Sequence, residues 1–352
     1  MRHIITRLIM VPSCSVWAQG NYYQNALGLR DDSLKTALHD IIDNHNPFPY
    51  TSSGTDTWDI LKDTDRDPNN SDNVILLYSG RSVDADQEYN NGAGWNREHV
   101  WTKSRGNFGT SQGAGTDAHH LRPCDISVNS VRGNRNFDDC ASCVDVIDEG
   151  TDTGSDYDNV DWTFEPRDAV KGDVARMIFY MAVRYEGGGG DPDLELTDVL
   201  QPQGSTQPLH ARMSTLLEWH RNDTVDNFEM NRNEVVYGYQ GNRNPFVDHP
   251  ELAEHLWGLL QQIHWNGQNT IGINEPEEST FTAFPNPTDD VVQWNEVAEM
   301  AQVFDLSGKL LITVEWTDRI LMSNAGIAAG TYVLVVHRAA GTKEINRIVY
   351  RP

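Results

Sequence analysis

An acid and an imidazole are adjacent at Glu98 and His99, within the segment WNREHVW (95–101). A neutral imidazole can take a proton from water near neutral pH, because its unperturbed pKa lies close to that value. A carboxylate oxygen is a hard ligand of the kind that Mg²⁺ prefers. The pair therefore has the chemistry that is needed to activate water for a hydrolytic reaction.

Basic side chains are concentrated around this pair. Residues 96–136 carry a local charge of +3, whereas the rest of the chain carries −28, which gives a net charge of −25. Such an acidic chain is a poor general partner for nucleic acid, which binds by releasing counterions to Lys and Arg. We therefore interpret the local basic residues as an anion site. They are Arg97, Lys103, Arg105, Arg122, Arg132 and Arg135.

The segment 96–136 also predicts a definite order of elements. Pro123 should end a strand, and Asp125 can cap a short helix that starts near Ile126. Asn129 and Arg132, three residues apart, share a face of that helix. The predicted order is strand, irregular loop, strand and helix. Phosphodiester hydrolysis needs a base, a hard cation and groups that neutralise phosphate charge, and each has a candidate here.

Four separated motifs occur in the order WNREHVW (95–101), DAHHLRPCDISVNSVRGNRNF (117–137), VKGDVARMIFYMAVRY (170–185) and QGNRNPFVDHPE (240–251). Together they resemble, in the same order, the motifs of the endonuclease I family of His-Me finger (ββα-metal) nucleases. The resemblance covers roughly residues 20–265. It implies an α+β fold, with a mainly helical nuclease domain around a ββα-metal finger. It also implies a hydrolase that cleaves DNA, and often RNA, without sequence preference and leaves 5′-phosphates.

The resemblance assigns roles to individual residues. His99 matches the general base, and Glu98 and Asn129 match the ligands of one catalytic Mg²⁺, for which other divalent cations can substitute. Arg132 matches a catalytic position near the site. The phosphate-stabilising arginine of some relatives has no clear match, and its candidates are Arg105 and Lys103. The side chains expected to contact nucleic acid are Arg97, Lys103, Arg122, Asn134 and Arg135; for Arg122 a structural ion pair is the alternative.

The two ends of the chain differ from the middle. Residues 1–18 combine basic residues, a short apolar stretch and small residues, which predicts a secretory signal peptide. We expect a nuclease domain over 19–268 and a polar, proline-containing linker over 269–280. Short β runs separated by turn residues predict a small all-β sandwich over 281–352.

The C-terminal segment resembles the sorting domain of the type IX secretion system of Gram-negative bacteria. The matching motifs are AFPNPTDDVV (283–292), VFDLSGKLL (303–311) and IAAGTYVLVV (327–336). The resemblance implies the secretion machinery as a partner, and a secreted, extracellular or cell-surface location. No segment approaches the ~20 apolar residues of a membrane span. We expect no membrane span and a monomeric protein.

The cysteines and histidines leave alternatives open. Cys124, Cys140 and Cys143 remain after signal removal, and an odd set predicts one disulfide and one buried thiol. The segment CASC (140–143) as half of a zinc site is the alternative. A zinc hydrolase that uses His99 with His119 and His120 has no familiar ligand spacing; we expect structural roles for those two histidines.

Two further classes of function compete with a nuclease. One is a non-catalytic surface protein that binds extracellular DNA through the same groove. The other is a secreted metallohydrolase that acts on a different phosphodiester. The presence of both Glu98 and His99 argues against a pure binding protein, because binding alone requires neither residue.

Overall fold

The structure is a computed structural model that describes residues 22–210, 212–267, 283–305, 309–337 and 343–352. The predicted signal peptide and linker lie outside the described residues. The chain divides into two compact units, residues 1–271 and 272–352. Each unit is described by itself.

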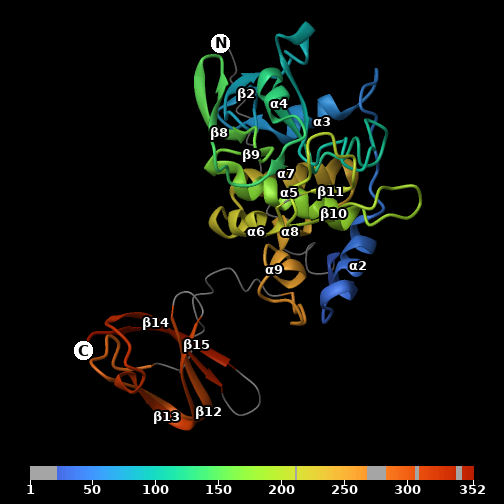
Figure 1. Ribbon diagram of the computed structural model, residues 1–352. Coiled ribbons are helices and arrows are strands. Elements are labelled where there is room, and N and C mark those ends of the chain that lie inside the picture. The colour runs from blue at the N-terminus through green and yellow to red at the C-terminus, as the bar shows by residue number, and fades with distance from the viewer. Residues whose placement is uncertain (1–21, 211, 268–282, 306–308, 338–342) are drawn as a thin grey trace, which may run out of the picture. The chain divides into compact units, whose positions relative to one another are not determined.

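The centre of the first unit is the helix α5 (Lys171–Arg184), whose residues from Gly172 onward are all buried. It is contacted by α2, α6 and α8, which lie below it in Figure 1. On α2, Leu34, Leu38 and Ile42 are buried because a spacing of four puts them on one face. The other helices are η1 (Gln24–Ala26), α2 (Asp31–Ile42), α3 (Thr57–Thr64), η2 (Asn90–Gly92), α4 (Ile126–Arg132), η3 (Asp168–Val170), α6 (Met213–Asn222), α7 (Asn227–Gln240), α8 (Pro245–Asp248) and α9 (Leu252–Trp257).

Several short sheets complete the first unit, so its class is mixed α+β. The expected mainly helical composition is not confirmed, because these sheets and long loops separate the helices. The strands are β1 (Arg66–Asp67), β2 (Asn70–Ile75) and β3 (Ser82–Asp84) in one sheet, β4 (Trp95–His99) and β5 (Leu121–Asp125) in a second, β6 (Asn136–Phe137), β9 (Thr163–Glu165), β8 (Thr151–Asp158) and β7 (Val144–Asp148) in a third, and β10 (Glu195–Leu196) and β11 (Leu209–His210) in a fourth.

The element order predicted for 96–136 is confirmed. β4 and β5 pair antiparallel, with Glu98 opposite Arg122, and α4 follows β5 directly. The expectation that Pro123 ends a strand is wrong, because Pro123 lies within β5, opposite Arg97. The carboxylate of Asp125 caps α4 by accepting from the backbone N–H of Ser127 at 2.8 Å and of Val128 at 3.2 Å. The metal that would make this unit a ββα-metal finger stays a prediction.

The loop between β4 and β5 is fastened to the helices through Asp117. Its buried carboxylate accepts hydrogen bonds from the hydroxyls of Tyr180 at 2.7 Å and Tyr185 at 2.9 Å, at the end of α5. Gln240 of α7 donates to the same carboxylate at 3.0 Å. Because both strands adjoin this loop, the helical core holds β4 and β5 in place.

The second unit is an antiparallel sheet with the strand order β13-β12-β14-β15. Within the described residues these four strands form one hydrogen-bonded sheet, and the two-sheet sandwich stays a prediction. The register of β12 shifts between Gln293 and Ala298, a bulge of the kind that bends a strand. The elements are β12 (Val291–Phe304), β13 (Leu310–Leu321), η4 (Met322–Ala325), β14 (Gly330–His337) and β15 (Lys343–Tyr350).

Candidate active site

A pocket of about 510 Å³ lies against β4 and α4. This volume is in the range of roughly 300–1,000 Å³ that is usual for ligand sites. The strand β4 and the helix α4 supply much of its lining, because they lie next to each other. Their lining residues are Asn96, Arg97, Glu98, His99, Asn129 and Arg132. The structure thus brings the predicted base and both predicted metal ligands into one pocket.

The carboxylate of Glu98 is buried and held from one side. The Tyr78 hydroxyl donates to its Oε1 at 2.8 Å, and the Arg132 Nε lies 3.3 Å from the same oxygen. Burial raises the pKa of Glu98, and the charge of Arg132 opposes this rise. Since both neighbours approach Oε1, neither of them occupies Oε2.

The imidazole of His99 is neutral and its tautomer is fixed. Burial, with a smaller contribution from nearby His120, holds the pKa of His99 well below its usual range. Nε2 lies 3.0 Å from the carbonyl oxygen of Gly115, which can only accept, so Nε2 carries the proton. Nδ1 therefore keeps its lone pair, and among the described residues it has no hydrogen-bond donor. A ring in this state can accept a proton from water.

The side chain of Asn129 is oriented by its neighbour on β4. Its Nδ2 donates to Oδ1 of Asn96 at 2.9 Å, which leaves the Asn129 Oδ1 as an acceptor. Glu98 of β4 and Asn129 of α4 both line the pocket, so the strand and the helix each contribute a hard oxygen ligand to it. This donor set fits a hard divalent cation that completes its shell with water and phosphate oxygens.

The structure corrects the expectation that Arg132 and Arg105 meet the reacting phosphate. Arg132 is fully buried, and it donates to the Thr102 hydroxyl and to the Val100 carbonyl. With its Nε beside Glu98, it is a positioning residue. Arg105 is also fully buried, does not line the pocket, and donates to the carbonyl of Asn134 at 2.7 Å. Burial, followed by the charge of Arg132, lowers the pKa of Arg105 to about 10.

Burial contradicts the interpretation of these basic residues as an anion site for most of them. Of the six, Lys103 is exposed, and it lines the pocket. The others bond to protein groups, because they fasten the strands and helix to the rest of the unit. The five buried side chains are Arg97, Arg105, Arg122, Arg132 and Arg135.

Three expected nucleic-acid contacts have structural partners instead. Arg122 forms ion pairs with Asp65 and, at 3.4 Å, with Asp173, so its structural alternative is the one observed. Arg135 packs 4.0 Å from the Trp162 ring centroid. The Oδ1 of Asn134 accepts from Trp162 Nε1 at 2.8 Å. Neither Arg122, Asn134 nor Arg135 lines the pocket, whereas Arg97 and Lys103 do.

The zinc alternative that uses His99, His119 and His120 is not supported by the described residues. His119 and His120 direct Nε2 to the carbonyls of Asn242 at 3.1 Å and Ala114 at 2.8 Å, as structural histidines do. Among the described residues they join no cluster of metal-binding side chains. Both histidines therefore have the structural roles that we expected.

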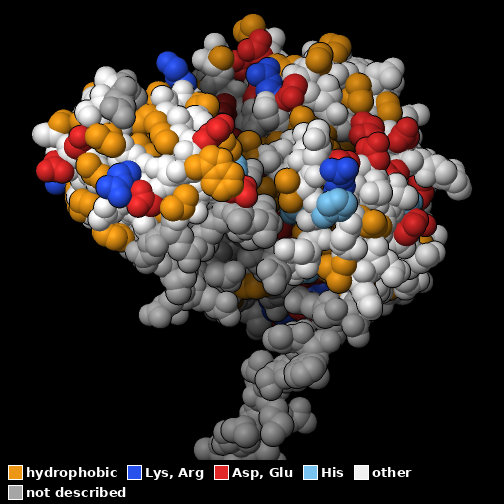
Figure 2. Space-filling view, turned by 90° about the horizontal axis from the view of Figure 1, so that it is seen from below, with side chains coloured by type: hydrophobic (Ala, Val, Ile, Leu, Met, Phe, Trp, Pro, Cys, Tyr) orange, Lys and Arg blue, Asp and Glu red, His pale blue; other side chains and the backbone are white. Residues whose placement is uncertain are grey.

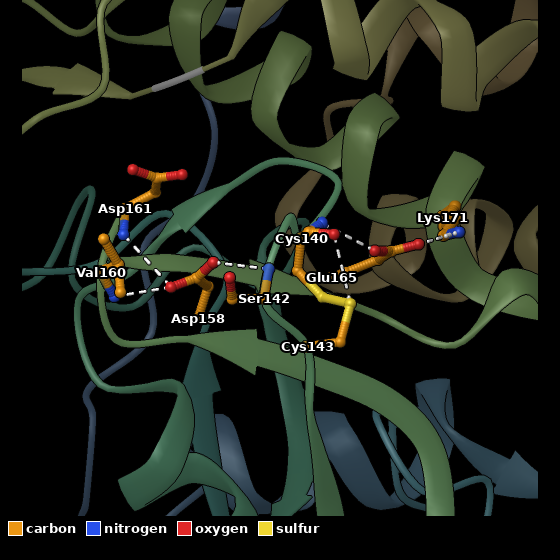
Figure 3. The surroundings of a disulfide bond; sticks show 8 residues. All are labelled: Cys140, Ser142, Cys143, Asp158, Val160, Asp161, Glu165 and Lys171. Carbon is orange, nitrogen blue, oxygen red and sulfur yellow. Dashed lines mark hydrogen bonds and ion pairs between the residues drawn. A yellow bond between two sulfur atoms is a disulfide. The ribbon is translucent and has the colours of Figure 1, made fainter.

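Cys140 and Cys143 form a disulfide and Cys124 is a buried free thiol, which confirms one disulfide and one thiol. Figure 3 shows the disulfide beside Glu165, whose Oε2 accepts from the Cys140 N–H at 2.9 Å. The other oxygen of Glu165 pairs with Lys171 at 2.7 Å. The disulfide uses both cysteines of the CASC segment, and both carboxylate oxygens of Glu165 have partners, the Cys140 N–H and Lys171.

Several residues of the site carried no signal in the sequence. Tyr78 lies 20 positions before Glu98 in the sequence, and only the folded structure brings its hydroxyl to the carboxylate of Glu98. Tyr50, Trp58 and Tyr89 line the pocket from segments outside the matched motifs. Asn96 lies inside the motif WNREHVW and could have been selected as a polar neighbour of Glu98.

The surface agrees with the acidic composition. On the face shown in Figure 2, Asp and Glu side chains gather in groups, whereas Lys and Arg occur singly. In the part of the chain that the structure describes, no helix combines the length and the apolar character that a membrane crossing requires.

A pocket that brings together an imidazole, a buried carboxylate and an oriented amide on a strand-loop-strand-helix unit contains the groups that a hydrolytic reaction needs. Residues 31–251 match the model of the endonuclease I family. The extracellular ribonuclease of Bacillus subtilis (strain 168) is 52% identical over 237 residues, which are 67% of this chain and 78% of that protein. The extracellular ribonuclease of Bacillus amyloliquefaciens is 51% identical over 237 residues, with the same coverage. This chain belongs to the endonuclease I family, and its class is nuclease.

One solved structure has a limited likeness to this chain. It is that of PorZ, a bacterial surface component of the type-IX secretion system of Porphyromonas gingivalis. The likeness covers 20% of this chain and 11% of PorZ, at 18% identity and a TM-score of 0.18. At that score it carries no argument about either unit.

Proposed function

We propose that this protein is a secreted, Mg²⁺-dependent endonuclease that hydrolyses phosphodiester bonds of DNA and RNA without sequence specificity. The observation that carries the proposal is the convergence of Glu98, His99 and Asn129 in one pocket on β4 and α4. The residues have complementary chemistry, since one can accept a proton and two offer hard oxygens.

In the proposed reaction His99 is the general base. The Nδ1 lone pair accepts a proton from the attacking water, while the Gly115 carbonyl keeps Nε2 protonated and the ring in place. The depressed pKa of His99 keeps the ring in its basic form at neutral pH. The water then attacks phosphorus, and the bond to the 3′ oxygen breaks, which leaves a 5′-phosphate on the product.

Glu98 and Asn129 would hold the divalent cation. When bound there, the cation supplies charge neutralisation for the phosphate and the departing 3′ oxygen. Tyr78 and Arg132 fix Glu98 through Oε1, so its orientation does not depend on the cation. Lys103, exposed at the pocket, supplies an ammonium for a phosphate oxygen.

The location and the polymer are proposed from the relatives and the sequence. Both Bacillus relatives are named extracellular ribonucleases, which supports RNA as a substrate and a secreted location. The signal-peptide pattern of 1–18 and the C-terminal motifs support export through type IX machinery, with the second unit as the sorting domain.

The test is an incubation of the purified protein with plasmid DNA and with RNA, in Mg²⁺ and in EDTA. We expect degradation of polymer in Mg²⁺ only, and products that carry 5′-phosphates. Binding of either polymer without cleavage would favour the non-catalytic surface protein. Hydrolysis of a small phosphodiester at the same rate as polymer would favour a different metallohydrolase.

A further inference from the structure

Tyr89 is an exposed aromatic residue on the wall of the pocket. It is 56% exposed, and it lines the same pocket as Glu98 and His99. Its carbonyl accepts from the N–H of Gly92 at 2.7 Å and of Gly94 at 3.3 Å, so the turn that leads into β4 fixes its backbone. Among the described residues, none forms a hydrogen bond or a ring contact with its side chain. An aromatic ring that is free on one face can stack on another planar ring.

The other aromatic rings of the pocket are already in use. The Arg97 guanidinium lies 3.4 Å from the centroid of the Tyr50 ring and 3.9 Å from that of Trp58. Trp58 also packs edge-on against Trp95 at 4.7 Å. Arg97 is itself held by bonds to the Tyr50 carbonyl and to the Thr57 hydroxyl. This rigid stack forms one wall, and Tyr89 offers an unoccupied ring to the same space.

The position of Tyr89 relates it to the reacting phosphate. The pocket extends along β4 from His99 to Asn96, about 10 Å at the usual rise of a strand. Glu98 and His99 lie toward one end of this stretch, Asn129 is bonded to Asn96 at the other, and Tyr89 precedes the strand at the Asn96 end. A substrate whose phosphate meets Glu98 and His99 would therefore carry a nucleoside toward Tyr89. The pocket volume exceeds what a cation and a phosphate alone require.

We propose that Tyr89 stacks on an unpaired base beside the scissile phosphate and that the pocket therefore prefers single-stranded nucleic acid to duplex. The inference rests on the proposed nuclease function. Aromatic side chains stack on bases of any sequence, which agrees with cleavage without sequence preference. A base in a duplex is stacked and paired, and its removal costs a few kcal/mol before it can reach such a ring.

The test compares the full-length protein with Tyr89→Ala and Tyr89→Phe. The probes are a fluorescein-labelled single-stranded RNA of mixed sequence and the same RNA annealed to its complement. Fluorescence anisotropy in EDTA measures binding without hydrolysis. We expect Tyr89→Ala to weaken binding of the single strand by about 5- to 150-fold, the loss that corresponds to one stacked base. Tyr89→Phe should bind like the wild type, because it keeps the ring.

Duplex binding should be the same in all three proteins. An affinity of Tyr89→Ala for the single strand within twofold of the wild type would overturn the inference, and so would equal losses on both probes. Cleavage of the same RNA in Mg²⁺ by the wild type tests the nuclease function separately. If cleavage is absent while binding depends on the Tyr89 ring, the nuclease proposal fails and the stacking site stands.

Discussion

At the residue scale, the site depends on a buried carboxylate that is held by neighbours outside the reaction. Tyr78 and Arg132 both approach the Oε1 of Glu98, so Oε2 can serve a cation without a change of rotamer. Partners of this kind orient metal ligands, and their loss commonly weakens metal binding about 10- to 100-fold. Tyr78 thus matters to the site although it touches neither cation nor substrate.

Tyr78→Phe should raise the Mg²⁺ concentration for half-maximal cleavage by about tenfold or more, because Glu98 loses its neutral donor. The measurement is a Mg²⁺ titration of initial rates on RNA. Tyr23→Phe is the control, because it removes a hydroxyl that donates to Asp248 at 2.7 Å, and neither residue lines the pocket. An unchanged Mg²⁺ requirement in Tyr78→Phe would show that Arg132 alone suffices to hold Glu98.

Asn129 gives a second prediction at this scale. Asn129→Ala removes one proposed ligand oxygen, so cleavage at limiting Mg²⁺ should fall by at least tenfold. Asn129→Asp keeps a hard oxygen and should retain much more activity when Mg²⁺ is saturating. Mg²⁺ titrations of both variants separate the ligand role from a structural one. Equal activity of Asn129→Ala and the wild type at every Mg²⁺ concentration would remove Asn129 from the metal site.

At the element scale, the site depends on the orientation of helix α4 and on the residue at which it begins. Asp125 caps this helix, and its other oxygen pairs with Arg81 at 3.0 Å. Because α4 is short, its N-terminal cap at Asp125 fixes the helix and therefore the position of Asn129 at the pocket. The helix and the strand β4 therefore act together, although neither holds the complete set of reactive groups.

Asp125→Ala should lower the free energy of unfolding by about 1 kcal/mol through loss of the cap. It should also reduce cleavage, because α4 frays and Asn129 loses its place. Asp125→Asn keeps a capping oxygen and loses the ion pair with Arg81, so it should be closer to the wild type in both respects. Denaturant unfolding and initial rates measure the two effects. A stable but inactive Asp125→Asn would mean that the Arg81 pair, and not the cap, orients the helix.

The elements also show what the sequence could predict. Asp125 is a local signal and correctly predicted the start of the helix, whereas Pro123 was expected to end a strand and instead lies within β5. The burial of Arg122 depends on Asp65, which is 57 positions away, and no local pattern contains that contact. The register shift of β12 between Gln293 and Ala298 likewise depends on how the strand pairs with β13, which no local pattern contains. Local chemistry was predictable, and long-range partners were not.

At the scale of the whole molecule, buried neutral histidines link stability to pH. Burial is the largest cause that lowers the pKa of His119, His120 and His220 to about 4 each. In the unfolded chain a histidine has a pKa of about 6.5, so between these values the unfolded state binds more protons. The stability from these residues is therefore complete above about pH 6.5 and is lost as the pH falls toward 4.

The free energy of unfolding should fall steeply between pH 6.5 and 4, by up to about 3 kcal/mol for each of these histidines. Urea unfolding at a series of pH values measures the slope. His220→Gln should flatten the slope, because the amide can still donate to the Pro250 carbonyl, which His220 Nε2 contacts at 2.9 Å, but it does not titrate. A stability that is constant over this range would contradict the burial of neutral rings.

The central claim is that His99 activates water in the pocket of β4 and α4. The most direct measurement is the rate of RNA and plasmid cleavage by His99→Gln in Mg²⁺, beside the wild type. The glutamine amide can donate to the Gly115 carbonyl but cannot take a proton from water. We expect unchanged thermal stability and a cleavage rate about 10²- to 10⁴-fold lower, the usual contribution of a general base. A folded His99→Gln protein that cleaves within a few-fold of the wild type would contradict the claim.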